Sequence, residues 1–418
     1  MKHPRLAIAV AFAVAALPAL ASGQLQTSQV QAEDLTQGLT PLPEKKAPAG
    51  RSGEAVPPTP APAEGQAIDL VLLLDTSNSM DGLIEQAKAQ LWGIVGRAAA
   101  GRQQGEVTLR VSLWEYGNDG LSPGEGYVRQ VVPLTNNLDA ISESLFALTT
   151  NGGSEFCGTV IQDAAEALDW AQTDQSYRAI FIAGNEPFTQ GSVDYREACG
   201  FAKGKGIVVN TIHCGDADTG REGQWVDGAR VGGGESFNIN QDRNAVPAIE
   251  CPQDGQLSAL GKELNETYLW YGVEPVRRRY AQQQVAQDAN AEALGDAVAV
   301  ERQTAKAGAA YGNAGRDLID TYSENMGELA EVPAEHLPES MRDLTPEQRE
   351  QKVAETAQRR RAIQEQIAQL SAARAEFLAA EQKKRAEAGE TTLGDAVNQA
   401  LDRQLDAAGL NSPTTQPS

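Results

Sequence analysis

Apolar runs alternate with helix-like patterns over residues 67–273. The runs that predict strands are 68–74, 107–114, 127–133, 178–183 and 207–212. Around them, apolar residues recur every three or four positions in 83–95, 160–168 and 257–268, which predicts amphipathic helices. Runs such as LVLLL and IFIA are apolar at every position, as parallel strands covered on both faces must be. The pattern predicts an α/β fold with a doubly wound, mostly parallel sheet, and ligands at the carboxyl ends of its strands.

The C-terminal part has a different pattern, rich in Ala, Gln and charged residues with few large apolar ones. We predict a helical region over 274–344, followed by a long helix and a short helix within 345–410. The long helix has clear start signals, because Thr345 is a good N-cap, Pro346 suits the first helical position and Gln348 completes a capping box. It is expected to end near Gly389, after roughly 60 Å at 1.5 Å per residue.

The apolar residues of the long helix follow a four-three spacing at Ile363, Ile367, Leu370 and Phe377, interrupted by Arg374. This spacing is typical of a coiled-coil seam, through which the chain would associate with itself. It is equally typical of one helix of an antiparallel hairpin formed with residues 280–325. Residues 411–418 are predicted to be a disordered tail.

The N-terminus has the features of a secretory signal peptide over residues 1–21. Two basic residues, Lys2 and Arg5, precede an apolar run, and Ala19-Leu20-Ala21 is a small-x-small cleavage site. Residues 22–66 are rich in Pro and Ala and predict a disordered linker. No later segment is apolar enough to predict a transmembrane helix. We therefore expect an exported protein, either periplasmic or extracellular.

The net charge bears on whether the protein binds nucleic acid, and the cysteine content bears on whether it forms disulfides. The formal net charge of −22 argues against nucleic acid, whose binding depends on Lys and Arg neutralising phosphates. Four cysteines remain after export, and an oxidising compartment favours disulfides, with three possible pairings. Cys214 and Cys251 flank one long loop region, so we expect this pair; the alternative is buried thiols.

Three oxygen-bearing side chains follow the first predicted strand. Asp75, Ser77 and Ser79 alternate along DTSNS, so an extended turn would bring their oxygens to one side. Hard oxygen donors suit Mg²⁺ above all, or Mn²⁺ or Ca²⁺. The alternative is that Ser79 or Asp81 simply caps the helix that follows.

The DTSNS segment after a hydrophobic strand resembles the metal-ion-dependent adhesion site (MIDAS) of von Willebrand factor type A (VWA) domains, with the pattern Asp-x-Ser-x-Ser. The resemblance covers residues 67–273 and extends to exported bacterial VWA proteins with a helical tail. It implies two further ligands, a Thr from a second loop and an Asp from a third. Here Ser154 in NGGSEF would take the Thr position. Gly184 falls where the Asp is usual, which leaves Asp75 as the one certain anionic ligand. Asn185 and Glu186, which follow Gly184, are the alternatives that would reach in instead.

A non-enzymatic binding protein is the function we expect from these residues. With Asp75 as the principal anionic ligand, the cation would attract a carboxylate from a protein partner, and an Asp at position 184 should strengthen metal binding. The domain has one histidine, His213, which we expect to be a hydrogen-bonded residue at a strand end, so no catalytic triad is evident. The alternative is a structural envelope protein with a degenerate metal site, interacting through its helical tail.

Overall fold

The computed structural model describes residues 56–100, 107–240, 250–387 and 392–410. The predicted signal peptide, most of the predicted linker and the C-terminal tail lie outside these ranges. The last linker residues contact the domain, since the N–H of Thr59 donates to Leu134 O and Arg110 donates to Thr59 O. In the described part, no helix combines the length and apolar character needed to cross a membrane.

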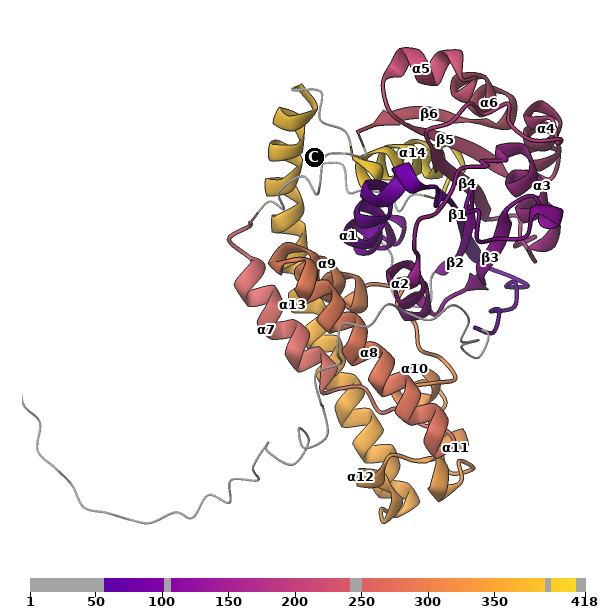
Figure 1. The fold of residues 1–418 in the computed structure, drawn as a ribbon. Helices are drawn as coiled ribbons and strands as arrows, with labels where there is room; N and C mark the ends of the chain where they lie inside the picture. Colours follow the sequence, from indigo (N-terminus) through magenta and orange to yellow (C-terminus); the bar gives the residue numbers. More distant parts are fainter. Residues whose placement is uncertain (1–55, 101–106, 241–249, 388–391, 411–418) are drawn as a thin grey trace, which may run out of the picture. The chain divides into compact units, whose positions relative to one another are not determined.

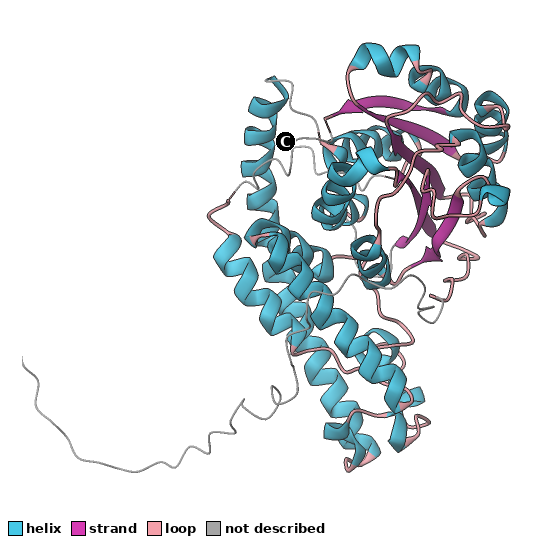
Figure 2. Cartoon of the chain, in the orientation of Figure 1, coloured by secondary structure: helices cyan, strands magenta, loops and turns pink. Residues whose placement is uncertain are grey.

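Six strands form one sheet in the order β3-β2-β1-β4-β5-β6, parallel except for the pair β2 and β3 (Figures 1 and 2). The strands are β1 (Gln66–Asp75), β2 (Val107–Tyr116), β3 (Val128–Thr135), β4 (Ser176–Gly184), β5 (Val208–Cys214) and β6 (Gly233–Ile239). The predicted doubly wound α/β fold is confirmed, with all five predicted strands. β6 was not predicted, because GGESFNI lacks a continuous apolar run.

Helices cover both faces of the sheet. They are α1 (Asp81–Ala98), α2 (Leu138–Ala147), α3 (Cys157–Ala167), α4 (Tyr195–Gly204), α5 (Ala217–Glu222) and α6 (Trp225–Gly232). Alternate residues of β1 enter different cores: Ile68 and Leu72 pack with α1, whereas Val71 and Leu73 pack with α3 and α4. This two-sided burial explains why the central strands are apolar at nearly every position.

A second set of helices follows β6. They are α7 (Asp254–Asn265), α8 (Glu274–Leu294), α9 (Asp296–Ala307), α10 (Leu318–Tyr322), α11 (Met326–Leu329), α12 (Glu339–Arg342), α13 (Pro346–Glu387) and α14 (Leu393–Ala407). The predicted helical character of the C-terminal region is confirmed. The capping box of the long helix is present too, since Thr345 N donates to Gln348 Oε1 at 2.9 Å and Gln348 N to Thr345 Oγ1 at 3.3 Å.

The apolar residues of α13 pack against other helices of the same chain. Ile363 and Ile367 are buried against Leu257 of α7 and Val300 of α9, and α13 also contacts α10. The interpretation as one helix packed on residues 280–325 therefore holds in part, with α7 as an additional neighbour. Phe377 stays 39% exposed. Coiled-coil self-association stays a prediction.

The last helix, α14, returns to the α/β layer. It packs against α1, β5 and β6, and Val397 and Leu401 are fully buried in the same core as Ile68. Tyr177 of β4 also donates a hydrogen bond to Gln404 of α14. The helices from α7 to α13 are thus inserted, along the chain, between β6 and a helix that covers the sheet. The predicted domain boundaries, 67–273, 274–344 and 345–410, place α14 apart from this layer.

Buried ion pairs compensate for the scarcity of large apolar residues in the helical region. Arg302 of α9 is fully buried and pairs with Asp139 of α2 at 2.8 Å and with Asp288 of α8. Arg360 of α13 pairs with Asp317 at 2.7 Å and with Asp320 at 2.8 Å. A buried charge without a partner is costly, so these pairs restrict how the helices can pack.

The predicted disulfide between Cys214 and Cys251 is not confirmed, since this structure holds the four cysteines buried and without a disulfide among the described residues. Cys214 ends β5 in the core beside Ile212 and Ile239. Cys251 precedes α7, where its N–H donates to Asp254. The two thiols have different neighbours, and Cys214 packs as a small hydrophobic side chain.

Replacing Leu401 with Ala tests whether α14 stabilises the α/β layer. We expect a loss of about 2–5 kcal/mol in the free energy of unfolding, because a fully buried Leu is removed. Gln399→Ala, an exposed change on the same helix, should be nearly neutral. Urea denaturation of both variants measures the difference; equal stabilities would show that α14 adds nothing.

Adjacent arginines of α13 give a matched test of the buried ion pairs. Arg360→Ala leaves two buried carboxylates without their cation and should cost about 3–5 kcal/mol in unfolding free energy. Arg359 forms an exposed pair with Glu266, so Arg359→Ala should cost under about 1 kcal/mol. A similar thermal midpoint for the two variants would contradict this account.

Candidate metal site at the end of the first strand

Asp75 is the last residue of β1, which lies between β2 and β4 in the sheet. The strand order reverses direction between β1 and β4, and doubly wound folds bind ligands at such a point. A short 3-10 turn, Asn78–Met80, then leads into α1. Two backbone hydrogen bonds join the DTSNS loop to the second loop, which contains NGGSEF. Asn151 N donates to Thr76 O at 2.9 Å, and Asn78 N donates to Gly152 O at 3.0 Å.

The Asp75 carboxylate is completely buried. Oδ1 accepts a hydrogen bond from Ser77 N at 2.8 Å, whereas Oδ2 has no hydrogen-bond donor in the described structure. Burial raises the pKa of Asp75 to about 7. Nearby Glu155 adds to this rise, whereas the N–H and hydroxyl of Ser77 and the N–H of Asn185 oppose it. A buried oxygen without a donor is rare in folded proteins, so this atom points to a missing ligand.

Ser77, Ser79 and Asn185 place further polar side-chain atoms next to one another, beyond Asp75. Ser77 Oγ lies 3.3 Å from Ser79 Oγ, and Asn185 Nδ2 donates to Ser79 Oγ at 3.0 Å. Asn185 Oδ1 is buried and has no hydrogen-bond partner in the described structure. No side chain caps the 3-10 turn or α1, so the helix-cap interpretation of DTSNS is not supported.

In the second loop, Glu155 is buried close to Asp75, and Ser154 is half-buried. Ser154 pairs through its backbone with Gly117, and no side-chain hydrogen bond of Ser154 is present in the described structure. The Glu155 side chain is 3% exposed. Burial raises the pKa of Glu155, Glu186 adds to that effect, and the Ser77 hydroxyl partly opposes it. The sequence did not single out Glu155, because nothing in NGGSEF shows which side chain turns inward.

Position 184 of the third loop has no room for a carboxylate side chain. A Cβ on Gly184 would lie 2.4 Å from Tyr116 Oη and 3.0 Å from Asp75 Oδ2. The expectation that an Asp at this position would strengthen metal binding is therefore unsupported by the geometry. Tyr116, which the sequence did not single out, occupies that space.

Glu186 and His213 form hydrogen bonds that hold the third loop. Glu186 accepts a hydrogen bond from Gln190 at 3.2 Å, and its backbone carbonyl accepts one from Trp225. His213 is buried, with Nε2 3.2 Å from Asn185 O and Nδ1 3.0 Å from Asn238 Nδ2. The expected strand-end role of His213 is confirmed, and it fixes the backbone of Asn185.

The donor set fits a hard divalent cation. Neither Asp75 nor Glu155 forms an ion pair with Lys or Arg in the described part of the chain, and the nearby oxygens belong to hydroxyl and amide groups. Across the described ranges, no three His, Cys, Asp or Glu side chains gather in a metal-binding arrangement. A cation here would thus depend on serine and asparagine oxygens besides the carboxylates, as Mg²⁺ and Ca²⁺ sites often do.

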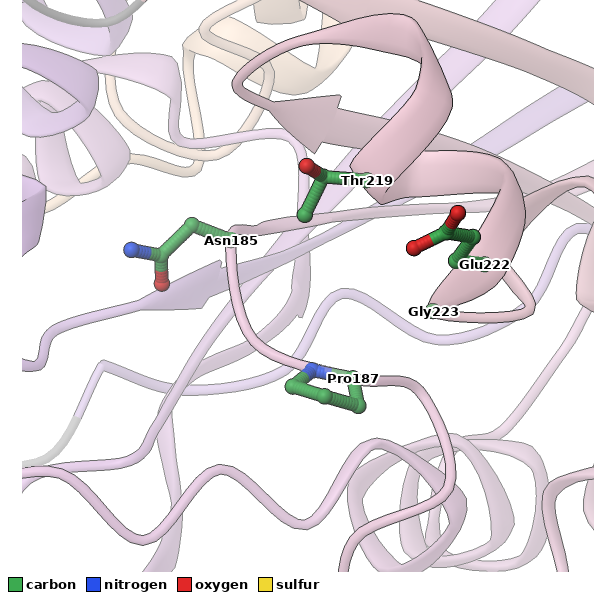
Figure 3. Close-up of a pocket in the computed structure, with 5 residues that line it drawn as sticks. All are labelled: Asn185, Pro187, Thr219, Glu222 and Gly223. Atoms are coloured by element: carbon green, nitrogen blue, oxygen red, sulfur yellow. The ribbon is translucent and has the colours of Figure 1, made fainter.

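A cavity of about 240 Å³ adjoins these residues, lined by Asn185, Pro187, Thr219, Glu222 and Gly223. Figure 3 shows the loop after β4 on one side of it and α5 on the other. Asn185 belongs to both the cavity and the oxygen set, so a molecule in the cavity would lie next to Ser79.

Comparisons with known proteins agree with this architecture. The family model of the von Willebrand factor type A domain matches residues 69–223. No curated protein matches the chain.

Solved structures similar to the chain include an aerotolerance-related membrane protein from Bacteroides fragilis, with 16% identity over 41% of this chain and 92% of that chain and a TM-score of 0.30. BatB from Bacteroides thetaiotaomicron has 17% identity over 41% and 90%, with a TM-score of 0.32. Proximal thread matrix protein 1 from the mussel byssus, with a zinc-occupied MIDAS motif, has 13% identity over 43% of each chain and a TM-score of 0.33.

The family match covers the sheet from β1 to β5, the loops around Asp75 and the helices up to α5. Residues 69–223 of this chain are therefore a von Willebrand factor type A domain.

Proposed function

We propose that the domain holds a divalent cation at the end of β1 and uses it to bind a protein partner that presents a carboxylate. The observation that supports this proposal best is Asp75 Oδ2, a fully buried carboxylate oxygen without a donor. Asp75, Ser77 and Ser79 would hold the cation. When bound, the cation supplies positive charge that attracts an anionic group.

Mg²⁺ is the ion we propose, with Mn²⁺ and Ca²⁺ as the alternatives, because all three prefer oxygen ligands. The adjoining cavity beside Asn185 gives the side chains next to the partner's carboxylate a place to pack. A non-enzymatic role is part of the proposal. Both ring nitrogens of His213 are engaged in hydrogen bonds, which disfavours its use as a general base.

Export belongs to the proposal as well. It depends on the signal-peptide features of residues 1–21, and it places the protein in the periplasm or outside the cell.

A second candidate function is a structural role in the cell envelope, with interactions through the helical region. Exposed apolar side chains on α8 and α13 favour it, namely Val285 at 67% and Phe377 at 39% exposure. The two functions differ in their metal requirement. Capture of a partner from envelope extract with and without EDTA separates them, since only the first predicts loss of capture in EDTA.

Asp75→Asn is the first test of the metal site, because it keeps the side-chain shape and removes the charge. We expect Mg²⁺ affinity to fall more than about 100-fold, since even outer-shell partners of a metal contribute 10–100-fold. Asp218→Asn, an exposed change on α5, is the control and should bind as the parent does. Calorimetric titration measures both. An unchanged affinity in Asp75→Asn would show that the loop holds no cation.

The raised pKa of Asp75 predicts how pH affects the metal-free protein. The folded state, with a pKa of about 7, binds this proton more tightly than the unfolded state, with 3.8. Raising the pH between these values should therefore lower the unfolding free energy. In EDTA, the parent should lose more stability than Asp75→Asn from pH 4 to pH 7 by urea denaturation. Parallel pH profiles would contradict the burial of an ionisable Asp75.

A further inference from the structure

We propose that Glu155 is a direct ligand of the cation, so that this domain carries its second carboxylate on the second loop. Tyr116 favours this arrangement, because it closes position 184 of the third loop, where the family pattern places an Asp. The inference deepens the proposed function and rests on it. It changes the expected charge of the site from one protein carboxylate to two.

Tyr116 fills the space next to Gly184, because its side chain is held in the core. Its side chain is fully buried, and its hydroxyl donates to Ala183 O at 3.0 Å. Cys157 Sγ lies 3.9 Å from the same hydroxyl. These contacts hold Oη 2.4 Å from the point where a Cβ on Gly184 would stand. Any side chain at position 184 would therefore displace either Tyr116 or the strand end.

Glu155 and Asp75 approach each other over Gly117. A Cβ on Gly117 would lie 2.8 Å from Asp75 Oδ1 and 2.9 Å from Glu155 Cγ. Gly117 has φ +82°, a conformation that glycine adopts without strain, and its lack of a side chain lets the two acids meet. The two acids thus share one small, polar space.

The charge around Glu155 calls for a cation. Glu155 is only 3% exposed, and the charged groups that most affect it are acidic, namely Glu186 and Asp119. Two buried carboxylates side by side repel each other unless a positive charge lies between them. The unpartnered Asp75 Oδ2 is the second, independent sign of a missing ligand.

Two carboxylates change what the site does. Together with a divalent cation they form a neutral set, so the domain should hold the cation without help from a partner. Less charge is then left for a partner's carboxylate, and because the two binding events are reciprocally linked, the partner should strengthen cation binding only modestly. This differs from the single-carboxylate site expected from the sequence.

The test compares Glu155→Gln with Glu186→Gln in the full chain, by calorimetric titration with Mn²⁺ as the probe. We expect Glu155→Gln to raise the Kd by about 10–100-fold, and Glu186→Gln to change it less than about threefold. In EDTA, the thermal midpoint of Glu155→Gln should equal or exceed that of the parent, because one of two repelling carboxylates is gone. A structural role alone would instead lower this midpoint.

The outcomes separate the two proposals. If the parent binds Mn²⁺ and Glu155→Gln binds it equally well, Glu155 is no ligand, while the metal-dependent function stands. If the parent binds neither Mn²⁺ nor Mg²⁺, both proposals are overturned. If Glu186→Gln shows the larger loss, the second carboxylate comes from the third loop instead.

Gly184→Asp tests the closed position. Its thermal midpoint in EDTA should fall, because the added Cβ overlaps Tyr116 Oη. Its Mn²⁺ affinity should not exceed that of the parent. Adding Tyr116→Phe should recover part of the lost midpoint, since the hydroxyl in the way is removed. Tighter Mn²⁺ binding by Gly184→Asp alone would show that the third loop is open and would overturn the inference.

Discussion

The carboxylate of Asp75, buried without a positive charge beside it, is the feature on which the proposed site at the end of β1 depends. Asp75 ends the central strand, is inaccessible to solvent and leaves Oδ2 without a donor. Folding such a group costs free energy, which a protein recovers only through protonation or a bound cation. The raised pKa describes the first state. In our proposal, the serines, Asn185 and Glu155 around Asp75 would favour the second state, in which a cation is bound.

The scaffold keeps this constraint in place by burying β1 on both faces. One face is covered by α1 and α14, and the other by α3 and α4. Because α14 comes after the long helical insertion, the layer over β1 includes residues from both ends of the described chain. Arg302 links the insertion back to the domain through Asp139 of α2. The helical region is therefore connected to the α/β layer by a buried ion pair as well as by the chain.

Much of the fold was predictable because it follows from local patterns. Five strands appear as apolar runs, and Thr345 and Gln348 mark the start of α13. The place of α14 was not predictable, since its apolar face fits any large core. DTSNS singles out Asp75, Ser77 and Ser79, whereas Glu155 and Tyr116 come close to Asp75 through tertiary packing that no local pattern shows. Cysteine number alone likewise cannot show that Cys214 and Cys251 have different neighbours.

The most direct measurement of the central claim is an anomalous-difference map from crystals grown with Mn²⁺. The account predicts one strong peak among Asp75 Oδ2, Ser77 Oγ and Ser79 Oγ, at distances typical of oxygen ligands, about 2.0–2.6 Å. A map without a peak there, with the Asp75 carboxylate still lacking a partner, would contradict the claim that this strand end exists to hold a cation.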